Sequence, residues 1–132
     1  MKRKLAQIAI LVNDYDEAIE FYVNKLNFIL VEDSKLSETK RWVLLSPSAS
    51  EGCMILLAKA SDDKQLLSVG NQAGGRVFLF LYTNDFENDF ENFLDNGVEF
   101  TRLPVREPWG MVAVFKDLYG NLWDLIEHKT GK

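Results

Sequence analysis

The chain has 132 residues, which is enough for one compact domain with its own core. It carries 20 acidic and 15 basic residues, for a formal net charge of −5, and has no dense Lys/Arg stripe. This argues against nucleic acid or an anionic membrane as the main partner. No apolar run approaches the roughly 18 residues of a membrane span and no secretory leader pattern is present, so we expect a cytoplasmic protein with a small-molecule or protein partner.

The first elements are an alternating apolar strand and an amphipathic helix. The strand pattern of LAQIAILV runs into Asn13-Asp14. Asp14 is predicted to cap the helix, with Glu17 as its capping-box partner. The apolar stripe of this helix comprises Tyr15, Ala18, Ile19, Tyr22 and Leu26. Asn27 then supplies the left-handed residue that ends it.

Three further strands complete the first half. They are predicted at FILVEDS, TKRWVLLS and CMILLAKA. The polar segment that follows, residues 61–75, contains three glycines and is predicted to be a connector with one helical turn at 63–67.

The second half repeats this order at an offset of 71 residues, because Asn13-Asp14 recurs as Asn84-Asp85. The strand VFLFLYTND leads into a helix whose predicted cap is Asp85. Gly97 ends this helix, and strands follow at EFTRLP, MVAVFK and LWDLIEH. The apolar stripe of the second helix comprises Phe86, Phe90, Phe93 and Leu94.

Each half therefore reads as strand, helix, strand, strand, strand. The predicted fold class is α+β, with two βαβββ modules at about 4–59 and 76–128, joined by a linker at 60–75, in a single domain covering 1–132. In each module the single helix covers only one face of the predicted sheet, so the other face is left uncovered. The two bare faces are expected either to curve into a cup or to stack as a dry sandwich.

The stretch LVNDYDEAIEFYVNKLNF and the ending WG…DLYGNLWDL resemble the vicinal oxygen chelate superfamily. This group includes glyoxalase I, extradiol dioxygenases, and the fosfomycin- and bleomycin-resistance proteins. The resemblance implies paired βαβββ modules around a cup and, commonly, a homodimer. It does not imply one activity, because the scaffold carries several reactions and also pure binders.

In the metalloenzymes of that superfamily, four inward strand positions hold a divalent metal. The resemblance places these positions at Gln7, Phe78, Asp124 and Leu56, with Ile55 as the alternative to Leu56. Phenylalanine and leucine have no lone pair to donate, so only two potential ligands remain. We therefore predict no metal at the inherited position and no cofactor, with a divalent metal as the alternative.

The central candidate is Asp124, an acid in the otherwise apolar last strand. Strand alternation places it on one face and Trp123 and Leu125 on the other. It is interpreted either as a structural acceptor bonded to Gln7 or a backbone N–H, or as a ligand anchor or catalytic general base. His128 shares its face but is about 13 Å further along, and is expected to be an exposed strand end.

The remaining candidates predict a largely apolar ligand site. Strand alternation predicts one inward row in each module, and the row of the second module is largely aromatic, with Arg76, Phe78, Phe80 and Tyr82. Trp109 in the Trp-Gly segment is expected to form a wall or lid of the cup or to pack on a partner subunit. The predicted ligand-binding residues are Gln7, Arg76, Phe78, Phe80, Tyr82, Trp109 and Asp124. In the alternative interpretation, the rings fill the cup completely. The segment 117–121 is predicted to be a turn that places Asp124, with no catalytic part.

Three functions are compatible with these patterns. The first is a metal-independent binder of a small aromatic or amphipathic molecule, as in bleomycin-type resistance proteins. The second is a metal-dependent enzyme of glyoxalase, dioxygenase or thiol-transferase type. The third is an interaction protein whose filled cup binds no ligand.

Overall fold

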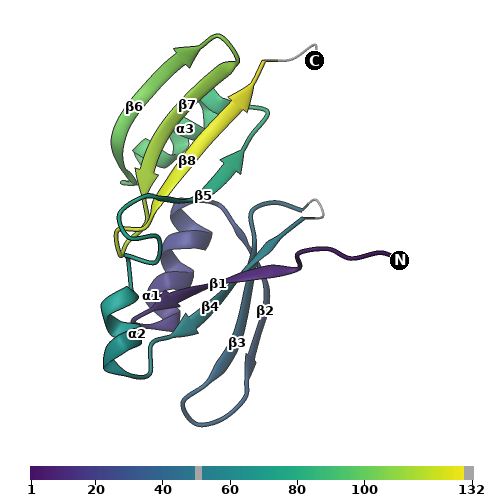
Figure 1. Ribbon diagram of the computed structural model, residues 1–132, viewed down its shortest axis with the longest axis vertical. Helices are drawn as coiled ribbons and strands as arrows, with labels where there is room; N and C mark the ends of the chain where they lie inside the picture. Colours follow the sequence, from purple (N-terminus) through teal and green to yellow (C-terminus); the bar gives the residue numbers. More distant parts are fainter. Residues whose placement is uncertain (50–51, 130–132) are drawn as a thin grey trace. The chain divides into compact units, whose positions relative to one another are not determined.

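The computed structural model describes residues 1–49 and 52–129, and the chain divides into two compact units, Met1–Val69 and Gly70–Lys132 (Figure 1). The first unit contains β1 (Gln7–Val12), α1 (Tyr15–Ile19), the helical turn η1 (Glu20–Lys25), β2 (Ile29–Lys35), β3 (Arg41–Ser46), β4 (Met54–Lys59) and α2 (Asp63–Ser68). The second contains β5 (Val77–Tyr82), α3 (Phe86–Asp95), β6 (Glu99–Glu107), β7 (Gly110–Lys116) and β8 (Leu122–His128). These elements confirm the predicted α+β class with two βαβββ modules. Among the described residues, every helix is too short or too polar to cross a bilayer.

The two sheets share one topology. Their strand orders are β1-β4-β3-β2 and β5-β8-β7-β6. In each sheet the first strand of the module pairs in parallel with the last, and the other pairs are antiparallel. The last strand of each module is therefore an interior strand, so the residues of β8 have neighbours on both sides.

The first helix departs from the predicted single α-helix. After α1 the chain continues as the π-helical turn η1, in which the Leu26 N–H donates to the Phe21 carbonyl at 3.2 Å, an i to i+5 bond. The wider turn rotates the later side chains relative to a 3.6-residue repeat. Within this turn Phe21, which is outside the predicted stripe, is buried beside Tyr22. Ile19 of the predicted stripe, at the end of α1, is only half-buried. Asn27 has a φ of 61°, which confirms it as the left-handed residue that ends the helix.

Helix α3 buries a narrower stripe than predicted. Phe86 and Phe93 are buried, Phe90 is half-buried and Leu94 is 49% exposed. At 100° per residue, Leu94 lies well to one side of the line through the three phenylalanines, so it falls at the margin of the contact with the sheet. Gly97 follows with a φ of 90°, as the sequence predicts.

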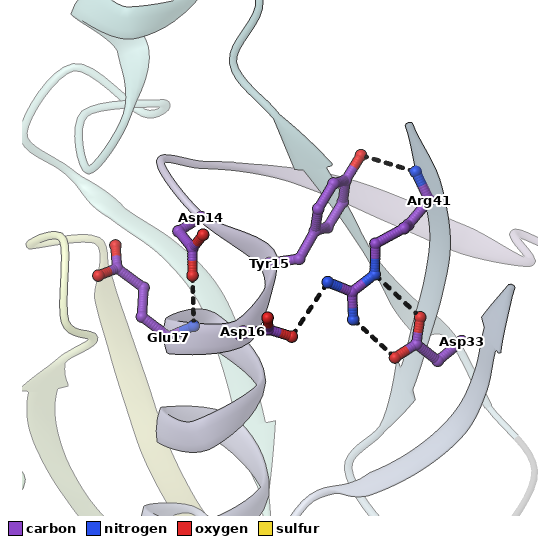
Figure 2. A network of polar contacts seen from close by, with 6 residues as sticks. All are labelled: Asp14, Tyr15, Asp16, Glu17, Asp33 and Arg41. Carbon is purple, nitrogen blue, oxygen red and sulfur yellow. Dashed lines mark hydrogen bonds and ion pairs between the residues drawn. The ribbon is translucent and has the colours of Figure 1, made fainter. Parts of the chain in front are cut away.

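The two predicted caps have different outcomes. The Asp14 carboxylate accepts from the Glu17 N–H at 2.9 Å, which confirms it as the N-cap of α1 (Figure 2). Asp85 occupies the predicted N-cap position of α3, but the prediction that its carboxylate caps the helix is wrong, because its side chain makes no cap bond. Instead, Glu127 of β8 accepts from the Phe86 N–H at 2.7 Å. The second helix is thus capped by a strand that lies 41 residues later in the chain.

This difference predicts a contrast between two equivalent substitutions. Asp14→Ala should lower the free energy of unfolding by about 1 kcal/mol, because it removes a cap bond. Asp85→Ala should change it by less than about 0.5 kcal/mol, because no cap bond is lost. Urea denaturation of both variants measures the contrast, and equal losses would contradict it.

Candidate functional site

The site is built on the turn that precedes β8. Asp117 is 3% exposed, and its Oδ1 accepts from the backbone N–H groups of Tyr119, Gly120 and Asn121 at 2.9, 3.0 and 3.0 Å. Its Oδ2 accepts from the Asn121 side-chain amide at 3.0 Å. Gly120 has a φ of 106°, which favours glycine. This confirms the predicted turn and gives β8 a fixed starting point.

The two faces of β8 have different surroundings. Trp123 and Leu125 are buried on the helix-covered side, where the Trp123 ring stacks on Phe115 at 5.8 Å. Asp124 alternates with them and lies on the opposite face, which we call the open face of the second sheet. The carboxyl group is half-buried.

The cross-strand register places Asp124 in a row of mixed character. Its direct partners are Phe80 of β5 and Val114 of β7, and Arg102 of β6 pairs with Val114 on the far side. Burial raises the pKa of the Asp124 carboxyl above its ordinary value, and the charge of Arg102 opposes that rise. An acid with apolar neighbours on both adjoining strands is a good acceptor for a donor group of a ligand.

The raised pKa predicts how stability depends on pH. The folded state holds the Asp124 proton more tightly than the unfolded chain does, so this group stabilises the fold most below its unfolded pKa. That contribution is lost as the pH rises from the ordinary value of 3.8 through the folded-state pKa. Asp124→Asn keeps the shape and removes the titration. The free energy of unfolding of Asp124→Asn minus that of wild type should therefore be larger at about pH 7 than at about pH 4, as measured by urea denaturation.

Asp95→Asn, at the exposed end of α3, is the matched control for that measurement. A stability difference between Asp124→Asn and wild type that stays constant over the pH range would contradict the prediction.

The predicted aromatic row contains an irregularity in β5. Phe80 and Tyr82 keep their register with Asp124 and Ile126, and they are 60% and 66% exposed. The register shifts between Val77 and Leu79, and Phe78 lies at this shift. Together with Arg76, Phe78 lines a cavity of about 250 Å³ beside the turn. That Arg76 and Phe78 form one row with Phe80 and Tyr82 stays a prediction.

His128 contacts two of the aromatic candidates. The Tyr82 ring lies 4.7 Å from the imidazole and the Trp109 ring lies 5.5 Å from it, between ring centroids. Trp109 is in the two-residue turn between β6 and β7, where its carbonyl accepts from the Lys129 N–H at 2.8 Å. Sequence reasoning correctly placed His128 at an exposed strand end but missed this cluster, because its members come from three separate segments.

Of the four positions at which the resemblance implies metal ligands, two carry no donor atom, because they are Leu56 and Phe78. Gln7 lies in β1 opposite Met54, and Asp124 lies in the other unit. Across residues 1–49 and 52–129, no three His, Cys, Asp or Glu side chains group as metal ligands. The side chains at these positions do not fit a divalent ion. The contact between Gln7 and Asp124 stays a prediction, because the two residues belong to different units.

A polar network that the sequence did not predict lies at the start of β3 (Figure 2). Arg41 makes a bidentate pair with Asp33, at 3.1 and 2.7 Å, and an ion pair with Asp16 at 3.0 Å. The guanidinium carbon is 5.1 Å from the centroid of the Tyr15 ring, and the Tyr15 hydroxyl accepts from the Arg41 N–H at 3.2 Å. Hydrogen bonding to Asp33 is the largest of the effects that raise the Arg41 pKa. The network ties the β2–β3 hairpin to the first helix.

Comparison with known proteins shows relatives over nearly the whole chain. An uncharacterized protein of Shewanella frigidimarina is 56% identical over 128 residues, covering 96% of this chain and 95% of the relative. The uncharacterized protein YurT of Bacillus subtilis is 30% identical, covering 94% of this chain and 98% of YurT.

Two solved structures resemble the fold closely. UcmS2 is 28% identical with a TM-score of 0.83, covering 96% of this chain and 98% of UcmS2. TnmS3, an antibiotic binding protein from Streptomyces sp. CB03234, is 24% identical with a TM-score of 0.78, covering 98% of each chain.

A family model matches residues 4–125, which span the first module and the second as far as the first half of β8, including Asp124. The match agrees with the fold and its repeated βαβββ units. The chain belongs to the Glyoxalase/Bleomycin resistance protein/Dioxygenase superfamily.

Proposed function

We propose that this protein binds a small, largely apolar molecule and does so without a metal ion at the inherited position. The observation that carries the proposal is the half-buried Asp124 on the open face, between Phe80 and Val114. Ligand sites are typically apolar surfaces with a few polar groups that set orientation, and this row has that composition.

The proposed roles follow from the surroundings of each residue. Asp124 anchors a donor group of the ligand, and Phe80, Tyr82 and Trp109 supply ring faces for its apolar body. Arg76 and Phe78 contribute through the small cavity beside the turn. Among the similar structures, TnmS3 is described as an antibiotic binding protein, so a fold of this kind is compatible with a small-molecule ligand.

We also propose that the protein is a cytoplasmic homodimer. Its strand β2 lies at the edge of the first sheet, where Ile29, Leu30 and Val31 are all partly exposed. An exposed apolar edge strand is a surface that a second subunit can cover.

Proflavine is a suitable probe for the anchor, because it is a planar cationic ring system with amino donors. In a buffer containing EDTA it should bind to the wild-type protein, and Asp124→Leu should weaken that binding by about 10- to 100-fold. The same substitution should leave the fold intact or slightly stabilise it, because a partly desolvated charge is removed. Fluorescence titration and thermal denaturation measure the two effects.

Asp95→Leu is the matched control, since it removes an exposed acid of α3. The assignment fails if Asp124→Leu keeps full affinity for proflavine, or if proflavine requires an added divalent metal in order to bind.

A further inference from the structure

A cavity lies on the helix-covered face of the second sheet, the face opposite Asp124. It has a volume of about 360 Å³ and is lined by residues of α3, β6, β7 and β8. A row of paired residues forms part of it, because Arg106 of β6 pairs with Met111 of β7, which in turn pairs with Glu127 of β8. Glu127 is two residues after the buried Leu125, so both lie on the side of β8 that α3 covers (Figure 1).

Part of the cavity wall is apolar. Phe86 and Phe90 lie one turn apart on α3, and their rings are nearly parallel, with 6.4 Å between their centroids. Pro104 and Met111 line the cavity from the strands, and both are half-buried. The volume falls within the range of about 300 to 1,000 Å³ that is typical of ligand pockets, so a small ring system can lie on this wall.

The charges of the cavity are mainly negative. The described residues that line it include three acids, Glu87, Glu91 and Glu127, and one base, Arg106. Within residues 1–49 and 52–129, none of these four side chains takes part in an ion pair. Glu127 is half-buried and accepts from the Phe86 N–H through Oε1, so its carboxylate is held in place at the wall. The excess of negative charge favours a ligand that carries positive charge.

The repeat provides a comparison, because the first module has a cavity of about 490 Å³ at the start of its own helix α1. The strand pairings of the two sheets make Arg41 the equivalent of Met111 and Lys59 the equivalent of Glu127. In the first module the guanidinium group of Arg41 is engaged in the network of Figure 2, and the described lining residues include four bases and three acids. At the same positions the second module has a thioether and a carboxylate. An apolar surface and uncompensated acids are thus particular to the second cavity.

We propose that this cavity is a binding site for a small amphipathic cation, such as an aryl-alkyl amine. The ammonium group of the ligand is held by Glu127 together with Glu87 and Glu91, and its ring lies on Phe90 and Met111. The site is not part of the function proposed above, because it lies on the opposite face of the same strand from Asp124. Either proposal can therefore fail without the other.

A methionine inside the cavity makes the test specific to this site. The chain has three methionines, and Met111 lines the cavity whereas Met1 and Met54 belong to the first unit. In the full chain labelled with ¹³C-methyl methionine, the Met111 signal is assigned by its loss in Met111→Leu. Titration with 1-naphthylmethylamine, which is a cation at neutral pH, should shift this signal to saturation. 1-Naphthalenemethanol has the same ring frame without the charge and is the matched probe.

The variants test the charge. Glu127→Gln keeps an oxygen for the Phe86 N–H and should weaken binding of the amine about five- to tenfold. Glu87→Gln together with Glu91→Gln should weaken it about threefold or more, because these acids are exposed and more strongly screened. Arg106→Gln should strengthen it about twofold or more, since a like charge is removed. Affinity for the alcohol should change less than about twofold in each variant.

Two controls locate the effect. Asp95→Asn removes an acid of α3 outside the cavity wall and should leave the affinity for the amine unchanged. Asp124→Leu removes the acid on the other face of β8, and the Met111 titration should remain within about twofold of wild type. Loss of proflavine binding in Asp124→Leu with an unchanged Met111 titration would separate the two sites.

Three results would overturn the proposal. They are no saturable shift of the Met111 signal, an affinity for the amine that survives in both glutamate variants, and a loss in Asp124→Leu as large as in Glu127→Gln. The circular dichroism spectrum of each variant shows whether it is folded. If Glu127→Gln does not fold, the exposed pair Glu87 and Glu91 and the opposite effect of Arg106→Gln still decide the outcome.

Discussion

Replacing Asp117 with alanine should lower the free energy of unfolding by about 3 to 5 kcal/mol. This buried carboxylate accepts from three consecutive backbone N–H groups and from the Asn121 amide. Alanine leaves those donors without their acceptor in a region with little access to water, and each unsatisfied buried donor costs about 1 to 3 kcal/mol, although such costs do not simply add. Urea denaturation at neutral pH measures the loss.

Asp62→Ala is the control for this experiment. Asp62 caps α2 through one exposed bond to the Gln65 N–H at 2.8 Å, so its removal should cost only about 1 kcal/mol. Because the Asp117 turn sets the start of β8, any folded Asp117→Ala protein should also bind proflavine less tightly. A loss of stability no larger than that of Asp62→Ala would show that the turn does not depend on this carboxylate.

The second large effect is expected at Gly110, which begins β7 directly after Trp109. Its φ is 153°, and a Cβ atom built there would lie only 2.0 Å from the Glu127 carbonyl oxygen. Gly110→Ala therefore requires β7 and β8 to move apart at His128, and Glu127 also caps α3. We expect a loss of about 3 kcal/mol or more, seen as a fall in Tm of about 10 °C or more.

Gly52→Ala is the matched control, because no atom lies within 4 Å of a Cβ built at that position. Its Tm should change by no more than about 2 °C. If Gly110→Ala also melted within that margin, the close packing of the β6–β7 turn against the end of β8 would not be needed for stability.

Local sequence patterns correctly predicted the positions of two helices, their ends, one turn and the two faces of β8. The repeated Asn-Asp pair located both helices, Asn27 and Gly97 ended them, and the Asp117 turn was predicted from its residue types. Strand alternation also placed Trp123 on the side of β8 that is buried under the helix and Asp124 on the other. Each of these features depends on residues within a few positions of one another, where backbone geometry leaves few choices.

Contacts between distant segments were decided only by the tertiary structure. Glu127 took the capping role that a repeat of the first module assigns to Asp85, because the end of β8 lies beside the start of α3. The register shift in β5 at Phe78 was also not predicted, since a bulge has no marker in an apolar strand.

The candidate sites show the same division. The ring of His128 contacts those of Tyr82 and Trp109, which come from two other segments. Neither the order nor the spacing of these residues in the chain indicates that their rings are in contact. A cavity of about 890 Å³ in the first unit is likewise lined by Lys40 of the β2–β3 hairpin and by Lys59 at the end of β4. A sequence specifies which charges exist, but only the pairing of strands and the ion pairs of Arg41 decide which of those charges still face a cavity.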